Sequence, residues 1–153
     1  MTNYNALEAA LWSVAIPGFG QLINKKYLKA LTLIALELLI NTQSHLNTVI
    51  IYSFNGQIAE AIFSTNYQWL MFYPCIYMFA VWDAYRDAGG NEIPLLFLPF
   101  ALSAYTGTIG VIFSNTFKIH HVLLGPLWML LSFALIGFGL GFIIRSIVLR
   151  YHK

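Results

Sequence analysis

The chain has 153 residues, of which 59% are hydrophobic and only 9% are charged. A soluble domain carries about 25% charged residues, and one of this size leaves about 30% of its unfolded surface exposed. The composition therefore excludes an ordinary soluble domain and predicts that lipid surrounds most of the chain. The net charge is only +2, and the basic residues stand at the ends of apolar runs. They form no stripe or patch, which excludes nucleic acid as a partner.

Five apolar segments are candidates to cross about 30 Å of hydrocarbon, which takes about 20 helical residues. The first is the weakest, because it contains Glu8 and is interrupted by Pro-Gly-Phe-Gly at 17–20. The last two are nearly free of charge. The predicted fold class is an all-α membrane protein, a single domain built as a bundle of about five transmembrane helices. The predicted spans are residues 6–23, 27–45, 67–83, 93–113 and 122–144.

The segment between the second and third spans contains no Lys or Arg over residues 46–66. Its two apolar stretches, 49–52 and 58–63, are too short to cross a bilayer, and Asn55-Gly56 between them is a turn signal. We expect two short amphipathic helices that lie on the membrane surface or cap the bundle. A re-entrant hairpin is the alternative.

The distribution of Lys and Arg predicts the orientation in the membrane. With five spans, all but one of them fall on the same side, and only Lys118 falls on the other. Positive charge marks the cytoplasmic side, so we expect a multi-pass protein of the cell membrane with its N-terminus outside and its C-terminus inside. The seven residues expected inside are Lys25, Lys26, Lys29, Arg86, Arg145, Arg150 and Lys153.

The most distinctive stretch is the turn between the first two predicted spans. Proline removes a backbone donor and glycine permits tight conformations, so a helix ends here if nearby groups satisfy the freed carbonyls. Gln21 and Asn24 are placed to do so. One interpretation is a tight helical hairpin with a basic interfacial turn; the other is a site for lipid headgroups or a protein partner. The residues of this turn are Pro17, Gly18, Gly20, Gln21, Lys25, Lys26, Tyr27 and Lys29.

The Pro-Gly-Phe-Gly-Gln sequence at 17–21, followed by Lys-Tyr-Leu-Lys-Ala at 26–30, resembles the turn of the two-transmembrane-helix domain family and its bacterial relatives. Val-Trp-Asp-Ala-Tyr-Arg at 81–86 is similar to the aspartate ending of that family. Here, however, Asp83 follows the third predicted span, after an insert at 41–66. The resemblance implies a bacterial membrane protein and adds no reaction.

Glu37 is the carboxylate deepest within an apolar run. It lies about 18 Å along a helix from Lys25, near the middle of a bilayer, where acidic groups are costly and face the bundle interior. A structural Glu37 would be hydrogen-bonded across the bundle to Tyr105, Thr106 or Thr108. The alternative is a residue that handles ions or protons.

The 82–87 segment has the composition of a cytoplasmic helix end. Asp83 shares a helix face with Arg86 and Asp87, and it could also reach Lys25 or Lys26. We interpret this group as a structural clamp of charges, with a gate or docking site as the alternative.

Small residues four apart let helices approach closely and serve either intramolecular packing or self-association. The sequence shows no catalytic arrangement, so no enzyme and no cofactor are expected. Adjacent His120 and His121 lack the third and fourth ligands that zinc requires, so no metal is expected, and Cys75 is interpreted as a small buried apolar residue. The small-residue pairs are Ser103 with Gly107 and Gly137 with Gly141.

These observations favour a small polytopic membrane protein that acts as a binding, assembly or regulatory component. It would use its helix faces and the basic cytoplasmic turn to contact the lipid bilayer, other membrane proteins or a second copy of itself. The alternative is a small ion or proton transporter or channel subunit that uses Glu37, since a carboxylate at the midplane and a glycine-broken helix are typical of ion paths.

Overall fold

The computed structural model describes residues 3–151, and these are mostly helical, which confirms the all-α class. Their order is α1 (Asn3–Ala15), α2 (Phe19–Ile23), α3 (Tyr27–Ser44), α4 (Leu46–Phe54), α5 (Ile58–Ser64), α6 (Tyr67–Leu70), α7 (Tyr73–Asp87), the 3₁₀ turn η1 (Gly90–Glu92), α8 (Phe97–Phe113), β1 (Lys118–Ile119), β2 (Val122–Leu123) and α9 (Gly125–Tyr151). The two strands form an antiparallel hairpin.

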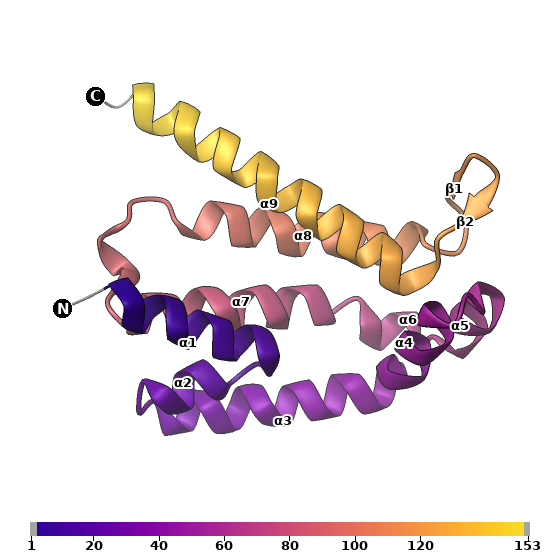
Figure 1. Cartoon of the computed structure of the whole chain (residues 1–153), viewed down its shortest axis with the longest axis horizontal. Helices are drawn as coiled ribbons and strands as arrows, with labels where there is room; N and C mark the ends of the chain where they lie inside the picture. Colours follow the sequence, from indigo (N-terminus) through magenta and orange to yellow (C-terminus); the bar gives the residue numbers. More distant parts are fainter. Residues whose placement is uncertain (1–2, 152–153) are drawn as a thin grey trace.

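Four helices, α3, α7, α8 and α9, run along the long axis of the molecule (Figure 1). The α2–α3 turn, the end of α7 and the C-terminal end of α9 lie at the same end of the long axis, and we call this the basic end because it carries Lys25, Lys26, Arg86, Arg145 and Arg150. The short helices α4 and α5 and the β-hairpin lie at the opposite end. Helix α7 contacts α1 and α3 on one side and α8 on the other, and α9 packs mainly on α8.

The predicted first span, residues 6–23, is not one continuous helix. Helix α1 starts at the basic end, stops at Ala15, and the chain reverses at Pro17-Gly18 so that α2 returns toward the same end (Figure 1). Gly18 adopts φ +105°, a conformation that side chains disfavour. The hydrophobic run at 6–23 is long enough for a crossing helix, but the chain reverses its direction at the proline-glycine break.

The predicted short helices between the second and third spans are confirmed as α4 and α5, with a turn at Asn55-Gly56 where Gly56 has φ +75°. They cover the start of α9. The indole N–H of Trp128 donates to the carbonyl of Ser53 at 3.3 Å, and the ring of Trp128 meets the edge of Phe54. The two short helices therefore pack against the start of α9.

The remaining helices keep the order predicted from the sequence but differ in their limits. The segment 67–83 is divided between α6 and α7, and Pro74 stands in the first turn of α7, where its missing N–H costs nothing. Helix α8 begins at Phe97, after the turn at η1. Within the described residues, Gly125–Tyr151 is the one helix long and apolar enough to cross a membrane, and Phe97–Phe113 is apolar but shorter.

The predicted small-residue faces lie inside the molecule, where α8 meets its neighbours. A side chain added at Gly137 would lie 1.9 Å from Thr106 Oγ1, and one at Gly141 would lie 2.3 Å from the Cα of Pro99. On α8, Gly107 faces Pro74 and Ala134, and the hydroxyl of Ser103 donates to the carbonyl of Ala134 at 2.8 Å. These faces therefore pack the chain against itself.

Candidate functional site

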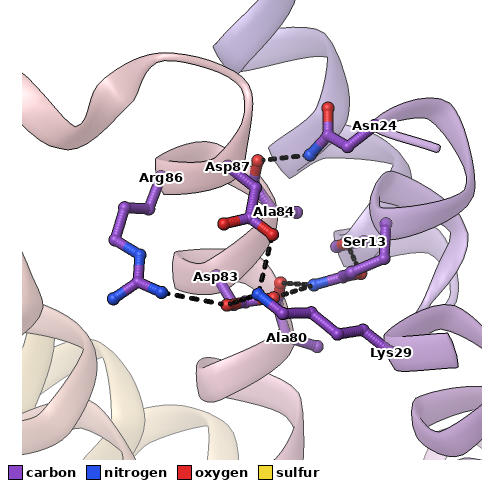
Figure 2. A network of polar contacts seen from close by, with 9 residues as sticks. Ser13, Asn24, Lys29, Ala80, Asp83, Ala84, Arg86 and Asp87 are labelled. Carbon is purple, nitrogen blue, oxygen red and sulfur yellow. Dashed lines mark hydrogen bonds and ion pairs between the residues drawn. The ribbon is translucent and has the colours of Figure 1, made fainter. Parts of the chain in front are cut away.

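A cluster of polar side chains joins α2, α3 and α7 at the basic end, and Figure 2 shows it closely. Its centre is Asp83, whose side chain is only 1% exposed. Lys29 Nζ lies 2.7 Å from Asp83 Oδ1, and Gln21 Nε2 donates to Asp83 Oδ2 at 3.1 Å. Both carboxylate oxygens thus have donors, which is what a buried charge requires.

The remaining charges of this cluster lie nearer to solvent. Lys29 also donates to Asp87 Oδ2 at 2.7 Å, so one ammonium group bridges two carboxylates. Arg86 Nη2 lies 3.6 Å from Asp83 Oδ1, as its i,i+3 spacing predicted, and its guanidinium stacks 4.5 Å from the ring centre of Trp82. We call Gln21, Lys29, Asp83, Arg86 and Asp87 the Asp83 cluster.

Gln21 holds the reversing segment to α7 from inside the protein. It is fully buried, and its Nε2 also donates to the carbonyl of Ala80 at 2.9 Å. Its Oε1 accepts the hydroxyl of Ser13 at 3.2 Å, and the same hydroxyl accepts the backbone N–H of Gly20 at 3.2 Å. Asn24 Nδ2 donates to the carbonyl of Ala84 at 2.8 Å. Gln21 and Asn24 therefore bond to backbone carbonyls of α7. The sequence had predicted that they would bond to the carbonyls freed at the proline-glycine break itself.

Close backbone approach explains the glycines of the turn. A side chain at Gly20 would lie 2.1 Å from the carbonyl oxygen of Ala9 and 2.7 Å from the Cβ of Ala84. One at Gly18 would lie 2.8 Å from the carbonyl oxygen of Ala30. Because these contacts involve backbone atoms and a Cβ, they cannot be relieved by rotating a side chain. The glycines let α1 and α2 lie directly on α3 and α7.

The lysine partner of Asp83 differs from the two predicted. Lys25 and Lys26 are exposed and form no ion pair within residues 3–151, and Lys29 takes the predicted role. The reason is local geometry. Lys25 has φ +59° and occupies the left-handed position of a Schellman motif that ends α2, with Lys25 N bonded to Leu22 O and Lys26 N to Gln21 O. Lys29 lies in the first turn of α3, and its ammonium group reaches the carboxylates of α7.

The pairing of Glu37 also differs from the prediction. Its Oε1 accepts the hydroxyl of Tyr73 on α7 at 3.3 Å, and its Oε2 is buried without a hydrogen-bond partner among the described residues. The expected partners on α8 are elsewhere: Thr108 bonds to the carbonyls of Met71 and Ala104, and Tyr105 is 65% exposed. Helix α3 packs on α7 and not on α8, so Glu37 cannot reach across the bundle.

Sequence reasoning missed Ser13 and two tyrosines, Tyr73 and Tyr77. Tyr77 donates to the carbonyl of Val14, one of the last carbonyls of α1, and thus satisfies a group freed where that helix ends. A serine in an apolar helix eight residues before Gln21 was the available signal. The distance between the two residues becomes short only after the chain reverses.

The adjacent histidines of the sequence and its one cysteine lie outside the Asp83 cluster. His120 and His121 both adopt positive φ, at 48° and 68°, at the tip of the β-hairpin. The structure brings no group of three His, Cys, Asp or Glu together in its described part. The expectation that Cys75 is buried was wrong, because this residue is exposed on α7.

The chain matches no protein-family model, no curated protein and no solved structure. The resemblance to the two-transmembrane-helix domain family therefore stays a prediction. The structure does bring its two parts together, since Gln21 of the first motif contacts Asp83 of the second. Chemically the cluster is closed: every carboxylate in it has a cationic partner, an arrangement suited to holding helices together.

Proposed function

We propose that this chain is a small polytopic protein of the cell membrane, without enzymatic activity, that binds other membrane components through a basic cytoplasmic turn. In this proposal α3, α6–α7, α8 and α9 cross the bilayer, while α1 and α2 enter it from the basic end and return. The large apolar side chains exposed along these helices support lipid as the surroundings; Leu28 is 81% and Leu135 is 72% exposed. The basic end faces the cytoplasm.

This topology differs from the sequence prediction only at the N-terminus. No Lys or Arg precedes residue 25, so the seven-to-one charge distribution is the same whether the first segment crosses or returns. Three reporters test this difference. A reporter fused before Met1 and one fused after Lys153 should both report the cytoplasmic side, and one inserted at Asn55 should report the outer side. Reporters on the two termini that face opposite sides would restore the five-span arrangement.

One observation supports the binding function most: the Asp83 cluster uses Lys29 but leaves Lys25 and Lys26 exposed in the turn that it fixes. A rigid, membrane-adjacent pair of free cations suits the anionic headgroups of the inner leaflet. The small-residue faces, by contrast, are occupied within the chain. We therefore assign binding to the turn and no longer to those faces.

Replacing both lysines tests this assignment. The variant Lys25→Gln/Lys26→Gln should fold normally, because neither side chain is in an ion pair, and should bind phosphatidylglycerol more weakly by about 1 kcal/mol per charge. The measurement is the enrichment of phosphatidylglycerol over phosphatidylcholine in lipid that co-purifies in mild detergent. Lys118→Gln, a loss of charge at the opposite end, is the matched control. Equal enrichment in the double variant and the wild type would remove the headgroup assignment.

The second candidate is ion or proton transport through Glu37. The observation in its favour is the buried Oε2, which lacks a hydrogen-bond partner in the described part of the chain. Against it, the hydroxyls of Thr106 and Thr108 on α8 bond to backbone carbonyls. Flux measurements on a Glu37 variant separate the two functions.

A further inference from the structure

Lys25 holds a backbone conformation that its side chain disfavours. Its φ is +59°, in the left-handed region where a Cβ crowds the following carbonyl oxygen, so glycine is the usual residue at this position of a Schellman motif. Lys26, the next residue, has an ordinary φ of −94°. A glycine at position 25 would form the same turn without this strain. The presence of a lysine there therefore calls for a role of its side chain.

Contacts among the described residues do not supply that role. His45 has almost the same φ, +60°, but its Nδ1 lies 3.0 Å from the carbonyl oxygen of Ser64 and bonds to it. The side chain of Lys25 is exposed and forms no ion pair within residues 3–151. A cation can also stabilise the carboxyl end of a helix, but α2 has only five residues and hence a small dipole. The ammonium group of Lys25 is therefore available to a group outside the chain.

The backbone around Lys25 is anchored to the rest of the molecule. Its own N–H donates to the carbonyl of Leu22 at 2.9 Å, and the N–H of Lys26 donates to the carbonyl of Gln21 at 2.8 Å. The side chains of Gln21 and Asn24 donate to carbonyls of α7 at 2.9 and 2.8 Å. The base of the Lys25 side chain is thus fixed before anything binds, which lowers the entropy that is lost when its ammonium group is engaged.

The surroundings of the two lysines favour a membrane lipid over a soluble anion. Large apolar side chains next to them in the chain are exposed, namely Leu22, Ile23, Tyr27 and Leu28. Transfer of such side chains from water into hydrocarbon is favourable, and tyrosine is enriched at the interface between membrane and water. Cations among exposed apolar side chains match a membrane surface, where anionic headgroups lie directly above hydrocarbon.

We propose that Lys25 is the specificity-determining residue of the basic turn and contacts the phosphate of an anionic phospholipid, while Lys26 adds only general positive charge. This inference rests on the proposed binding function and states how the binding is divided between two lysines of equal charge. Attraction by charge alone would be divided equally, because each lysine near an anionic surface contributes alike. A direct contact from the strained position makes the division unequal.

Single variants of the full chain measure this division. The enrichment of phosphatidylglycerol over phosphatidylcholine in co-purifying lipid should fall about tenfold in Lys25→Gln and about twofold in Lys26→Gln, which together approach the loss expected of the double variant. Equal losses in the two single variants, or a larger loss in Lys26→Gln, would overturn the inference and leave the proposed function standing. A double variant that loses no enrichment would overturn both.

Glycine variants test whether the lysine is kept at the expense of stability. Lys25→Gly should raise the melting temperature in detergent, because it relieves the left-handed strain, and should lower the enrichment of phosphatidylglycerol as much as Lys25→Gln does. Lys26→Gly is the matched control and should leave the melting temperature unchanged or lower it, since glycine adds entropy to the unfolded chain. A melting temperature that stays the same or falls in Lys25→Gly would show that the lysine serves the turn itself, and would overturn the inference.

Inorganic phosphate separates a lipid from a soluble anion as the ligand of Lys25. The enrichment of phosphatidylglycerol on the wild type should be the same in sodium phosphate and in sodium chloride of equal ionic strength, because equal ionic strength screens charges equally. Loss of phosphatidylglycerol in phosphate but not in chloride would assign Lys25 to a soluble anion and overturn the lipid contact.

Discussion

The two halves of the molecule are held together by different forces. In the first half, α1, α2, α3 and α7 meet around buried polar groups, with Asp83 and Gln21 fully enclosed. In the second half, α8 and α9 pack through glycines and apolar side chains, and the hydroxyls of Ser103 and Thr106 bond to backbone carbonyls. The difference shows which task the few charged residues of this chain have in its fold. Charges specify where a broken helix must return, and glycines set how closely two continuous helices lie.

The largest effect should come from the centre of the polar half. Asp83→Asn removes the charge that Lys29 and Arg86 share and places an N–H₂ group opposite other donors. Breaking a buried pair costs about 3–5 kcal/mol; we expect about 3, since Lys29 is 42% exposed and keeps Asp87. The measurement is the free energy of unfolding in mixed micelles.

Asp87→Asn is the matched control, because Asp87 bonds to the same lysine but is 13% exposed. It should lower stability clearly less than Asp83→Asn does, because Asp87 lies nearer to solvent and its loss leaves Lys29 paired with Asp83. If Asp83→Asn and Asp87→Asn lowered the free energy of unfolding by the same small amount, the buried carboxylate of Asp83 would not be what stabilises the first half.

The stability of the second half, α8 with α9, should depend on side-chain volume at the helix contact and not on charge. Gly137→Ala places a Cβ 1.9 Å from Thr106 Oγ1 and 2.5 Å from the carbonyl oxygen of Leu102, and overpacking of this kind costs about 1–3 kcal/mol. Gly139→Ala on the same helix meets nothing within 4 Å and should be neutral or stabilising by up to about 1 kcal/mol, because alanine favours helix. Thermal unfolding in detergent measures both. A destabilised Gly139→Ala would indicate that this exposed face has a partner of its own.

The smallest effect should come from Glu37, the polar residue that the first half leaves incompletely bonded. Glutamine has the shape of a protonated glutamic acid, and its Oε1 can still accept the hydroxyl of Tyr73. Glu37→Gln should therefore change stability by less than about 1 kcal/mol, the net value of one neutral hydrogen bond. Proton and cation flux in reconstituted vesicles is the second measurement. Flux in the wild type that disappears in a stably folded Glu37→Gln variant would favour transport over binding.

Local signals in the sequence were sufficient for most helices. The second predicted span, 27–45, is close to α3 at Tyr27–Ser44, and the short helices flanking Asn55-Gly56 are where the turn signal placed them. Apolar runs and breakers act on neighbouring residues, so their effect can be read along the chain. The ion pair of Asp83 with Arg86 was predictable for the same reason, since residues three positions apart on one helix share a face.

The sequence by itself determined the helical class, the break at 17–20 and the gathering of basic residues, because composition and backbone chemistry are properties of the chain alone. Only the tertiary structure decided the direction taken after that break, and with it the partners of Asp83, Gln21 and Glu37. A proline-glycine pair ends a helix but does not say whether the next one continues or returns. The charge count could not decide either, because no Lys or Arg stands before the break. That choice depends on contacts with α7, about 60 residues further along the chain.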